Sequence, residues 1–189
     1  MITKFDFRYT DIEGVITIQP FCAKDERGSL IKDYDQNAFN DFGIKEPIKE
    51  VFYTQSKRGV IRANHFQIGI HQAKIVRCIS GRVYDVITDL RRNSSTYGQH
   101  VSFELTGENQ LQVYVPKYCA HGYLVLEDSI VSYKADEFFC ASGDTGIMWN
   151  DADLNIDWPL DLVGGEENLI ISKKDQQLMS FSEYTKLKI

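Results

Sequence analysis

Residues 74–90 read KIVRCISGRVYDVITDL, and this stretch decides the fold. It is rich in Val, Ile and Tyr, residue types that are enriched in β-strands. If it is a strand, Lys74 and Val76 face one side while Ile75 and Arg77 face the other, because successive side chains alternate across a strand. The Ser-Gly-Arg in its middle is a turn signal. The stretch therefore predicts β-structure divided by a turn.

Working outward, the rest of the chain repeats this pattern of short β-like runs and turn signals. Further runs rich in Val, Ile, Tyr and Phe cover residues 14–21, 49–56, 100–106, 110–116, 123–135 and 145–150. Turn signals such as KDERGS, TGENQ, LEDS and ASGDTG separate them. Strands this short bury a core only together, so they predict an all-β sandwich or barrel. The chain shows no linker or repeat, so residues 1–189 are expected to form a single domain.

Two segments carry helix signals instead. Residues 35–44, DQNAFNDFGI, predict a short helix with Phe39 and Phe42 on one face. Near the C-terminus, SKKDQQLMSFSEYTKL predicts a helix from about Ser172, with Asp175 at the capping-box position. The expected shape is a β-sandwich with short peripheral helices.

Composition narrows the class of protein. Hydrophobic residues make up 43% of the chain, charged residues 25%, and the net charge is -6. An acidic chain without a basic face does not indicate nucleic-acid binding. No run is long enough to span a membrane, and the N-terminus lacks the apolar region of a signal peptide. The four cysteines are far apart and form no CxxC, which indicates reduced thiols, with Cys22, Cys78 and Cys119 in the core of a cytoplasmic protein.

A second stretch, RANHFQIGIHQAK, begins at Arg62 and concentrates polar groups. Strand alternation places Arg62 and Asn64 on one face and His65, with small or apolar neighbours, on the other. That face is either the wall of a pocket or the core. A further histidine, His121, precedes the run at 123–135.

Several longer motifs carry a resemblance. In chain order they are KDERGSL, GVIRANHFQ, QAKIVRCISGRVYDVITDLRRNSSTYG, VPKYCAHGYLVLEDS, VSYKADEFF, GIMWNDADLNIDWP and ISKKD. Over roughly residues 15–176 they resemble the dTDP-4-dehydrorhamnose 3,5-epimerase family. The resemblance implies a cupin-type jelly roll and a homodimer, in which N-terminal strands such as VITIQPF are exchanged. It also implies an epimerase without metal or cofactor, acting on a nucleotide-diphosphate-linked 4-keto-6-deoxy sugar.

The chemistry explains the residues that such an enzyme needs. A ketone at C4 acidifies the protons at C3 and C5, so a base must remove a proton from one face and an acid must return one on the other. The resemblance implies that His65 is the base, that Asp175 orients it, and that Tyr133 is the acid. It further implies a substrate-binding set of Arg27, Arg62, Gln72, Lys74, His121 and Phe138, with Lys74 near the C4 oxygen and the arginines on the nucleotide and phosphates.

The chain departs from the family pattern at Lys32, Glu50, Phe52, Ala63 and Asn64, and at Phe138 and Phe139, where many members have tyrosines. Glu50 and Phe52 stand where the family has nucleotide contacts, so we expect a nucleotide other than dTDP, or one that is held differently; CDP, GDP and UDP are open. Whether C3, C5 or both are inverted is also open.

Three alternatives remain at this point. A cupin of another reaction type, such as a 3,4-ketoisomerase, would also move protons next to a keto group. A non-catalytic sugar-binding cupin is a second alternative. A metal site of His65, His71 and His121 is the third, since three imidazoles are able to hold Zn or Fe.

Overall fold

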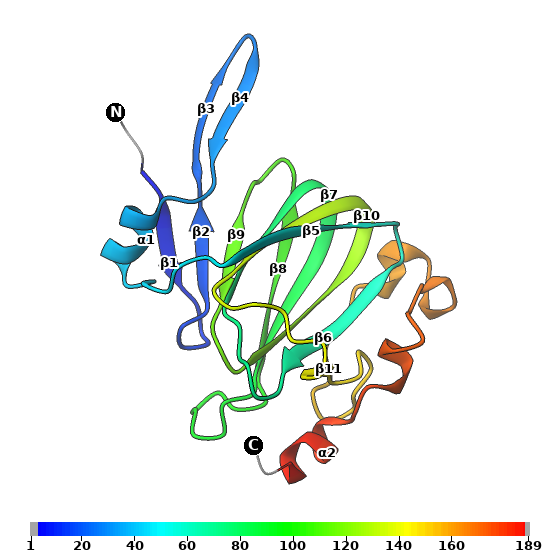
Figure 1. The fold of residues 1–189 in the computed structure, drawn as a ribbon. Coiled ribbons are helices and arrows are strands. Elements are labelled where there is room, and N and C mark those ends of the chain that lie inside the picture. The colour runs from blue at the N-terminus through cyan, green and yellow to red at the C-terminus, as the bar shows by residue number, and fades with distance from the viewer. Residues whose placement is uncertain (1–3, 188–189) are drawn as a thin grey trace.

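Two long strands, β7 (Lys74–Asp89) and β10 (Cys119–Ala135), run through the centre of the molecule and pair antiparallel with each other (Figure 1). The structure is a computed structural model that describes residues 4–187. The other strands are β1 (Asp6–Tyr9), β2 (Ile16–Gln19), β3 (Phe21–Asp25), β4 (Gly28–Lys32), β5 (Glu50–Ser56), β6 (Ile61–Gln67), β8 (His100–Thr106), β9 (Gln112–Val115) and β11 (Asp144–Gly146).

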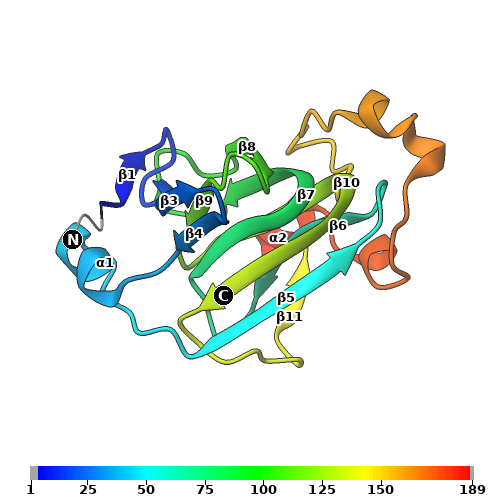
Figure 2. The same cartoon turned by 90° about the horizontal axis from the view of Figure 1, so that it is seen from above.

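Each of the long strands takes part in both layers of the sandwich. The first part of β7 pairs with β9 and its second part with β8, while the start of β10 pairs with β6 and its end with β5. One layer therefore runs β1-β2-β9-β7-β10-β5 and the other β8-β7-β10-β6-β11 (Figure 2). This antiparallel jelly-roll sandwich confirms the predicted fold class.

The two turn signals inside the long runs mark bends rather than turns. Gly81 lies within β7 with φ +82°, and a Cβ atom added there would lie 2.2 Å from the carbonyl oxygen of Asp128. The register of β10 against β7 shifts between Val125 and Val131, which is where the LEDS signal falls. The predicted turns at these two places are wrong, because glycine and bulges bend the paired strands without ending them.

The alternation predicted for the start of β7 is confirmed. Val76 packs in the apolar core between the layers, and Lys74 lines a pocket at one end of that core. Ile75 faces the opposite side, where it packs with Phe39 and with strands β1 and β2. Strand β7 therefore divides the interior of the sandwich from the cluster beneath α1 (Gln36–Phe42).

The short helix predicted at 35–44 is confirmed as α1. The Asp35 side chain accepts hydrogen bonds from two backbone N–H groups of the first turn, and Gly43 ends the helix with φ +114°. Both are common helix boundaries, since aspartate caps the N-terminus and glycine tolerates the left-handed conformation.

The C-terminal region differs from its prediction. The segment after Ser172 forms a single 3-10 turn, η3 (Asp175–Gln177), and helix α2 (Phe181–Lys186) begins later, with a capping box between Ser180 and Glu183. The helix predicted from about Ser172 is therefore wrong in its start. Two further 3-10 helices, η1 (Leu160–Val163) and η2 (Glu166–Asn168), precede it.

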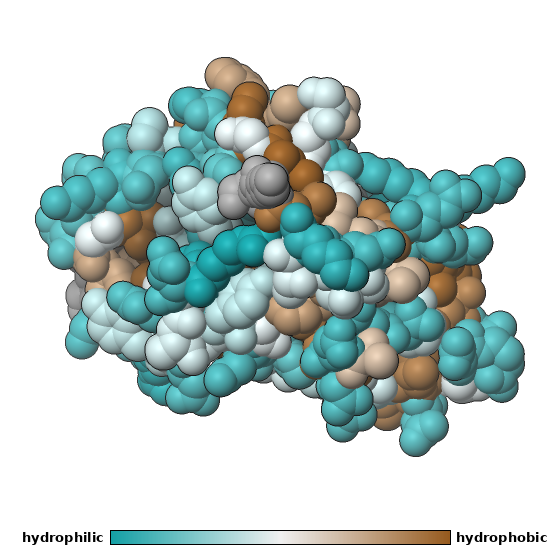
Figure 3. All heavy atoms as spheres, turned by 90° about the horizontal axis from the view of Figure 1, so that it is seen from below, coloured by the Kyte–Doolittle hydropathy of each residue, from teal (hydrophilic) through white to brown (hydrophobic). Residues whose placement is uncertain are grey.

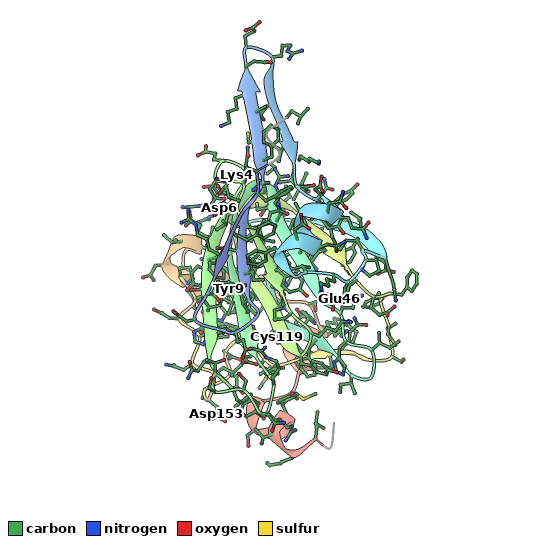
Figure 4. The ribbon with its side chains drawn as sticks, turned by 90° about the vertical axis from the view of Figure 1, so that its left-hand side faces the viewer. Lys4, Asp6, Tyr9, Glu46, Cys119 and Asp153 are labelled. Carbon is green, nitrogen blue, oxygen red and sulfur yellow. The ribbon has the colours of Figure 1, made fainter. Side chains whose placement is uncertain are left out.

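Strands β3 and β4 form a hairpin that projects from the body of the molecule (Figure 4). Strand β2, which precedes it, pairs with β1 and β9 of the same chain. Cys22 lies on this hairpin and is only partly buried, so its assignment to the core is wrong. Cys78 and Cys119 are buried as predicted, and burial raises their thiol pKa values to about 11 and about 12.

Polar residues predominate on the face that Figure 3 shows. Seen from below, apolar residues show in small groups among polar ones (Figure 3). Within residues 4–187, no helix combines the length and the apolar character that a membrane crossing needs.

Candidate active site

A cavity of about 360 Å³ opens between the two layers of the sandwich. Strands β5, β6, β7 and β10 and the segment around η3 form its walls, so residues far apart in sequence meet in it. The lining residues are Phe52, Thr54, Arg62, His65, Gln67, Gln72, Lys74, His121, Gly122, Tyr123, Tyr133, Phe139, Asp144, Ser172, Lys174 and Asp175. We call this cavity the catalytic pocket.

A bulge in β6 decides which side chains reach the catalytic pocket. His65 lies opposite His121 of β10, and Arg62 lies opposite Tyr123, so three residue steps on β6 match two on β10. The extra residue breaks the strand alternation. Arg62 and His65 consequently both line the pocket, and the prediction that they face opposite sides is wrong.

Asn64 lies inside this bulge and is completely buried. Its backbone oxygen accepts a hydrogen bond of 3.0 Å from the N–H of Ile147, whereas neither polar atom of its side-chain amide has a hydrogen-bond partner. The backbone thus anchors the bulge to the neighbouring strand β11, and the amide adds an unsatisfied buried group.

The structure brings His65 and Asp175 together, as the resemblance implied. Nε2 of His65 lies 3.2 Å from Oδ2 of Asp175; the His65 side chain is 25% exposed and the Asp175 side chain 8%. Ser172 holds the carboxylate from behind: its hydroxyl donates to Oδ1 at 2.8 Å and accepts from the Asp175 N–H at 3.0 Å. The Ser172–Asp175 pair that the sequence predicted as a capping box thus orients the carboxylate at the start of a 3-10 turn.

Tyr133 stands on β10 in the wall of the same pocket and is only 6% exposed. Phe52 stacks on its ring at 4.8 Å with an interplanar angle of 11°. Burial, followed by the neighbouring Tyr123, raises the pKa of Tyr133 well above its ordinary value. The phenol is therefore a protonated group at neutral pH and a suitable proton donor.

Lys74 adds a cation to the pocket wall. Burial lowers its pKa below the ordinary 10.5, and the nearby Asp144 carboxylate partly offsets this effect. A partly desolvated ammonium group interacts strongly with an oxyanion, because little water competes for it.

His121 forms a second histidine–carboxylate pair next to the first. Its Nε2 lies 2.7 Å from Oδ2 of Asp85, and the two side chains are 6% and 0% exposed. Its ring also meets the Tyr133 ring edge-on at 6.0 Å. His121 therefore lies between the two predicted catalytic side chains: it contacts the Tyr133 ring and is the cross-strand neighbour of His65.

Two more of the predicted substrate contacts line the pocket. Nε and Nη2 of Arg62 both donate to Ser56 Oγ, at 3.3 and 3.2 Å. The Gln72 amide donates to the carbonyl oxygen of Glu137 at 2.6 Å. Their head groups are thus held in place before any substrate arrives.

The other two predicted contacts lie elsewhere. Arg27 is at the tip of the β3–β4 hairpin, paired with Asp25 and 84% exposed, and it does not line the catalytic pocket. Phe138 points outside the pocket, with Lys49 over its ring at 5.8 Å, and its neighbour Phe139 lines the pocket instead. The substrate contact of Phe138 stays a prediction, since in this chain its neighbour lines the pocket.

Several pocket residues were not identified from the sequence, among them Thr54, Tyr123 and Lys174. Lys174 lies in the ISKKD motif next to Asp175, which was a usable signal. Thr54 and Tyr123 lie within runs that read only as strands, and nothing in their sequence surroundings separates them from core residues.

A second cavity of about 340 Å³ adjoins the catalytic pocket, and the two share His65, Gln67, Gln72, Lys74 and His121. His71 borders this second cavity, where its ring lies 4.0 Å from that of Tyr118. Although three histidines surround this space, residues 4–187 contain no group of three or more His, Cys, Asp or Glu side chains placed to hold a metal ion.

Comparison with known proteins gives a consistent result. Residues 9–183 match the family model described as dTDP-4-dehydrorhamnose 3,5-epimerase. The enzyme of that name from Methanothermobacter thermautotrophicus is 40% identical over 176 residues, which cover 93% of this chain and 94% of that protein.

Solved structures agree with the sequence relatives. A dTDP-4-dehydrorhamnose 3,5-epimerase from Elizabethkingia anophelis superposes with a TM-score of 0.87 at 37% identity, over 95% of this chain and 97% of that one. A dTDP-6-deoxy-D-glucose-3,5-epimerase from Legionella pneumophila, in complex with dTDP-4-keto-L-rhamnose, gives a TM-score of 0.88 at 31% identity, over 94% and 93%. The jelly roll is thus of the cupin type.

Proposed function

The chain belongs to the dTDP-4-dehydrorhamnose 3,5-epimerase family, and from this premise we propose that it inverts C3 and C5 of a nucleotide-linked 4-keto-6-deoxyhexose in deoxysugar biosynthesis. One observation carries the proposal. His65, hydrogen-bonded to Asp175, shares a pocket with the buried phenol of Tyr133 and the ammonium group of Lys74. These are the base, acid and oxyanion partner that proton transfer next to a ketone requires.

His65 is the base in this scheme. The Asp175 carboxylate lies at Nε2, so it favours the tautomer that carries its proton on that nitrogen and leaves Nδ1 free to accept the substrate proton. Once the imidazolium forms, the same carboxylate stabilises it. The pair therefore both orients the base and favours the product of proton abstraction.

Lys74 and Tyr133 complete the reaction. Removal of the C5 or C3 proton moves negative charge onto the C4 oxygen, and the Lys74 ammonium group stabilises that enolate. Tyr133 then donates its phenolic proton to the opposite face of the carbon, which inverts the centre. The C–H bond that breaks gives its proton to His65, and the C–H bond that forms takes its proton from Tyr133.

We infer a homodimer from the position of Arg27. The hairpin that carries it projects from the body, and Leu30 on the same hairpin is 63% exposed (Figure 4). In a second copy, this tip is free to approach the pocket and to supply Arg27 to the diphosphate beside Arg62. Mixing Arg27→Ala subunits with His65→Asn subunits tests this inference. Neither variant forms an intact site with itself, whereas a mixed dimer joins the His65 of one subunit to the Arg27 of the other at one site. Recovered activity supports the dimer, and its absence in confirmed mixed dimers contradicts it.

We further infer that the nucleotide is held differently from the family pattern. The Glu50 carboxylate accepts a hydrogen bond of 3.0 Å from the backbone N–H of Phe139, and the Phe52 ring stacks on that of Tyr133. Neither residue offers the amide group of the family's contacts. Titration with dTDP, CDP, GDP and UDP measures which nucleotide binds most tightly. Clearly tightest binding of dTDP would contradict this inference.

A cytoplasmic location is also part of the proposal. All four cysteines are unpaired, as expected in a reducing compartment.

The activity is tested in heavy water with a panel of nucleotide-linked 4-keto-6-deoxy sugars, followed by NMR. The proposal predicts deuterium at C3 and C5 while the keto group stays at C4. Movement of the keto group to C3 would show a ketoisomerase instead. Absence of any label with every sugar would contradict both enzymatic activities.

A further inference from the structure

Two buried cations on the outer face of the sandwich share one carboxylate. Arg77 of β7 and Lys134 of β10 each directly follow a residue of the interior cluster, so strand alternation turns them to the opposite face. Nη1 of Arg77 lies 3.3 Å and Nζ of Lys134 lies 2.8 Å from Oδ2 of Asp33. The two cationic side chains are 7% and 10% exposed, and in the described part of the chain Asp33 is the ion-pair partner of both.

This cluster lies at the base of the hairpin that carries Arg27. Asp33 directly follows strand β4, and at the other base of the hairpin Pro20 joins β2 to β3, where its ring fixes one backbone angle. Beyond the base the hairpin stands clear of the body, and residues 23–30 are all exposed (Figure 4). Within residues 4–187 its two strands pair only with each other. The direction of the hairpin is therefore set at its base.

The length of the hairpin makes the angle at its base important. Each strand has five residues and spans about 16 Å, so a tilt of about 10° at the base moves the tip by about 3 Å. That displacement equals the length of a hydrogen bond. Arg27 is at the tip, so a small tilt would break its proposed contact with the diphosphate in a second copy.

We propose that Asp33 is a positioning residue for the site of the other subunit. Its ion pairs with Arg77 and Lys134 clamp the base of the hairpin to the two central strands, and this clamp holds Arg27 at the angle at which it meets the substrate diphosphate. A buried cation without a partner is costly, so the two cations hold the carboxylate in place. The inference rests on the proposed function and on the homodimer inferred with it.

The first test is Asp33→Asn, which keeps the size of the side chain and removes its charge. The hairpin is then held less firmly, so we expect KM for the nucleotide sugar to rise about tenfold at unchanged kcat, because only binding is weakened. Asp33→Glu keeps the charge and should restore most of the loss. Asp128→Asn, which breaks an exposed ion pair with Lys57 away from the hairpin, is the control and should have wild-type kinetics.

Mixed dimers, isolated with two affinity tags, show on which site Asp33 acts. In the first, a subunit with both Asp33→Asn and His65→Asn is joined to a wild-type subunit, so the working pocket receives the altered hairpin. In the second, an Asp33→Asn subunit is joined to a His65→Asn subunit, so the working pocket belongs to the altered chain but receives an unaltered hairpin. We expect a raised KM in the first mixed dimer and a wild-type KM in the second.

A second variant keeps the proposal testable if Asp33→Asn folds poorly. Lys134→Met removes one of the two ion pairs and leaves Arg77 paired with Asp33, so no buried cation loses its partner. We expect a smaller rise in KM, again only in the mixed dimer whose working pocket receives the altered hairpin.

The outcomes separate this inference from the proposed function. A raised KM only in the second mixed dimer would assign the effect of Asp33 to its own pocket and overturn the proposal, as would a monomeric wild-type protein. Wild-type KM in both Asp33→Asn and Lys134→Met, with an active wild-type enzyme, would overturn the clamp alone. A wild-type enzyme that labels no 4-keto sugar would overturn the proposed function and the clamp with it.

Discussion

Two histidine–carboxylate pairs lie side by side in this protein, and they differ in their access to solvent. His65 and His121 face each other across β6 and β10. The His121–Asp85 pair is short, 2.7 Å, and almost completely buried, whereas the His65–Asp175 pair measures 3.2 Å and leaves a quarter of the His65 side chain exposed. The same two groups therefore suit different tasks: the His121–Asp85 pair is placed to hold the pocket wall, whereas in the proposed reaction the His65–Asp175 pair transfers protons.

The difference originates in the elements that carry the carboxylates. Asp85 lies in the middle of β7, paired on both sides with β8 and β10. Asp175 lies on a 3-10 turn and is held by Ser172. A carboxylate on a central strand has little freedom, while one on a peripheral turn is able to follow the small movements of a ring that changes its charge.

The largest effect on the rate is expected when the His65–Asp175 pair loses its charged partner. Asp175→Asn preserves the shape but no longer favours the imidazolium, so kcat should fall about 10²–10⁴-fold with little change in KM. Steady-state kinetics measures this. Asp161→Asn, on the exposed 3-10 helix η1, is the control and should have wild-type rates. A kcat within threefold of wild type in Asp175→Asn would contradict the role of the pair.

Breaking the buried pair should instead reduce stability. Asp85→Asn leaves His121 with a weaker partner in an almost completely buried site, and we expect a loss of about 1–3 kcal/mol in the free energy of unfolding. Urea titration of Asp85→Asn and Asp175→Asn compares the two pairs directly. If the loss in Asp175→Asn equals or exceeds that in Asp85→Asn, the distinction between them does not hold.

The pH dependence of the rate sharpens the comparison, because a third group, Lys74, borders both histidines. Its pKa is lowered by burial, and only the protonated form stabilises an enolate, so kcat/KM should fall as the pH rises through a value below 10.5. Above that value the rate should drop about tenfold per pH unit. Lys74→Arg should move this alkaline limb upward, since arginine stays charged. An unchanged limb would assign it to another group.

The smallest effect concerns the bulge that places His65. Asn64 buries an amide without hydrogen bonds, and Asn64→Leu replaces it by an apolar side chain of similar size. We expect a gain of about 1 kcal/mol in the free energy of unfolding, because an unsatisfied buried amide is removed. Thermal or urea unfolding measures it, and unchanged kcat shows that the backbone alone sets the bulge. A loss of stability would indicate that the amide has a partner.

The sequence predicted most strands of the sandwich and the first helix, and the family resemblance implied the His65–Asp175 pair. Strands β1, β3 and β4 were not predicted. The sequence was least informative where the backbone bends or bulges. Gly81 has the same signature in a turn as in a bend, so the continuity of β7 was not visible. Strand alternation failed at Arg62 and His65 because one bulged residue changes the face of everything beyond it. The same limitation hid Tyr123, whose position in the pocket depends on how β10 bends.

The most direct test of the account is deuterium incorporation by His65→Asn and His121→Asn, measured by NMR with the same nucleotide-linked 4-keto sugar. Nucleotide binding is measured in parallel to show that both variants are folded. If His65 is the base, His65→Asn places no label at C3 or C5 above the enzyme-free rate, while His121→Asn still labels both carbons at a reduced rate. Retained labelling in His65→Asn, or its loss only in His121→Asn, would contradict the assignment of the base.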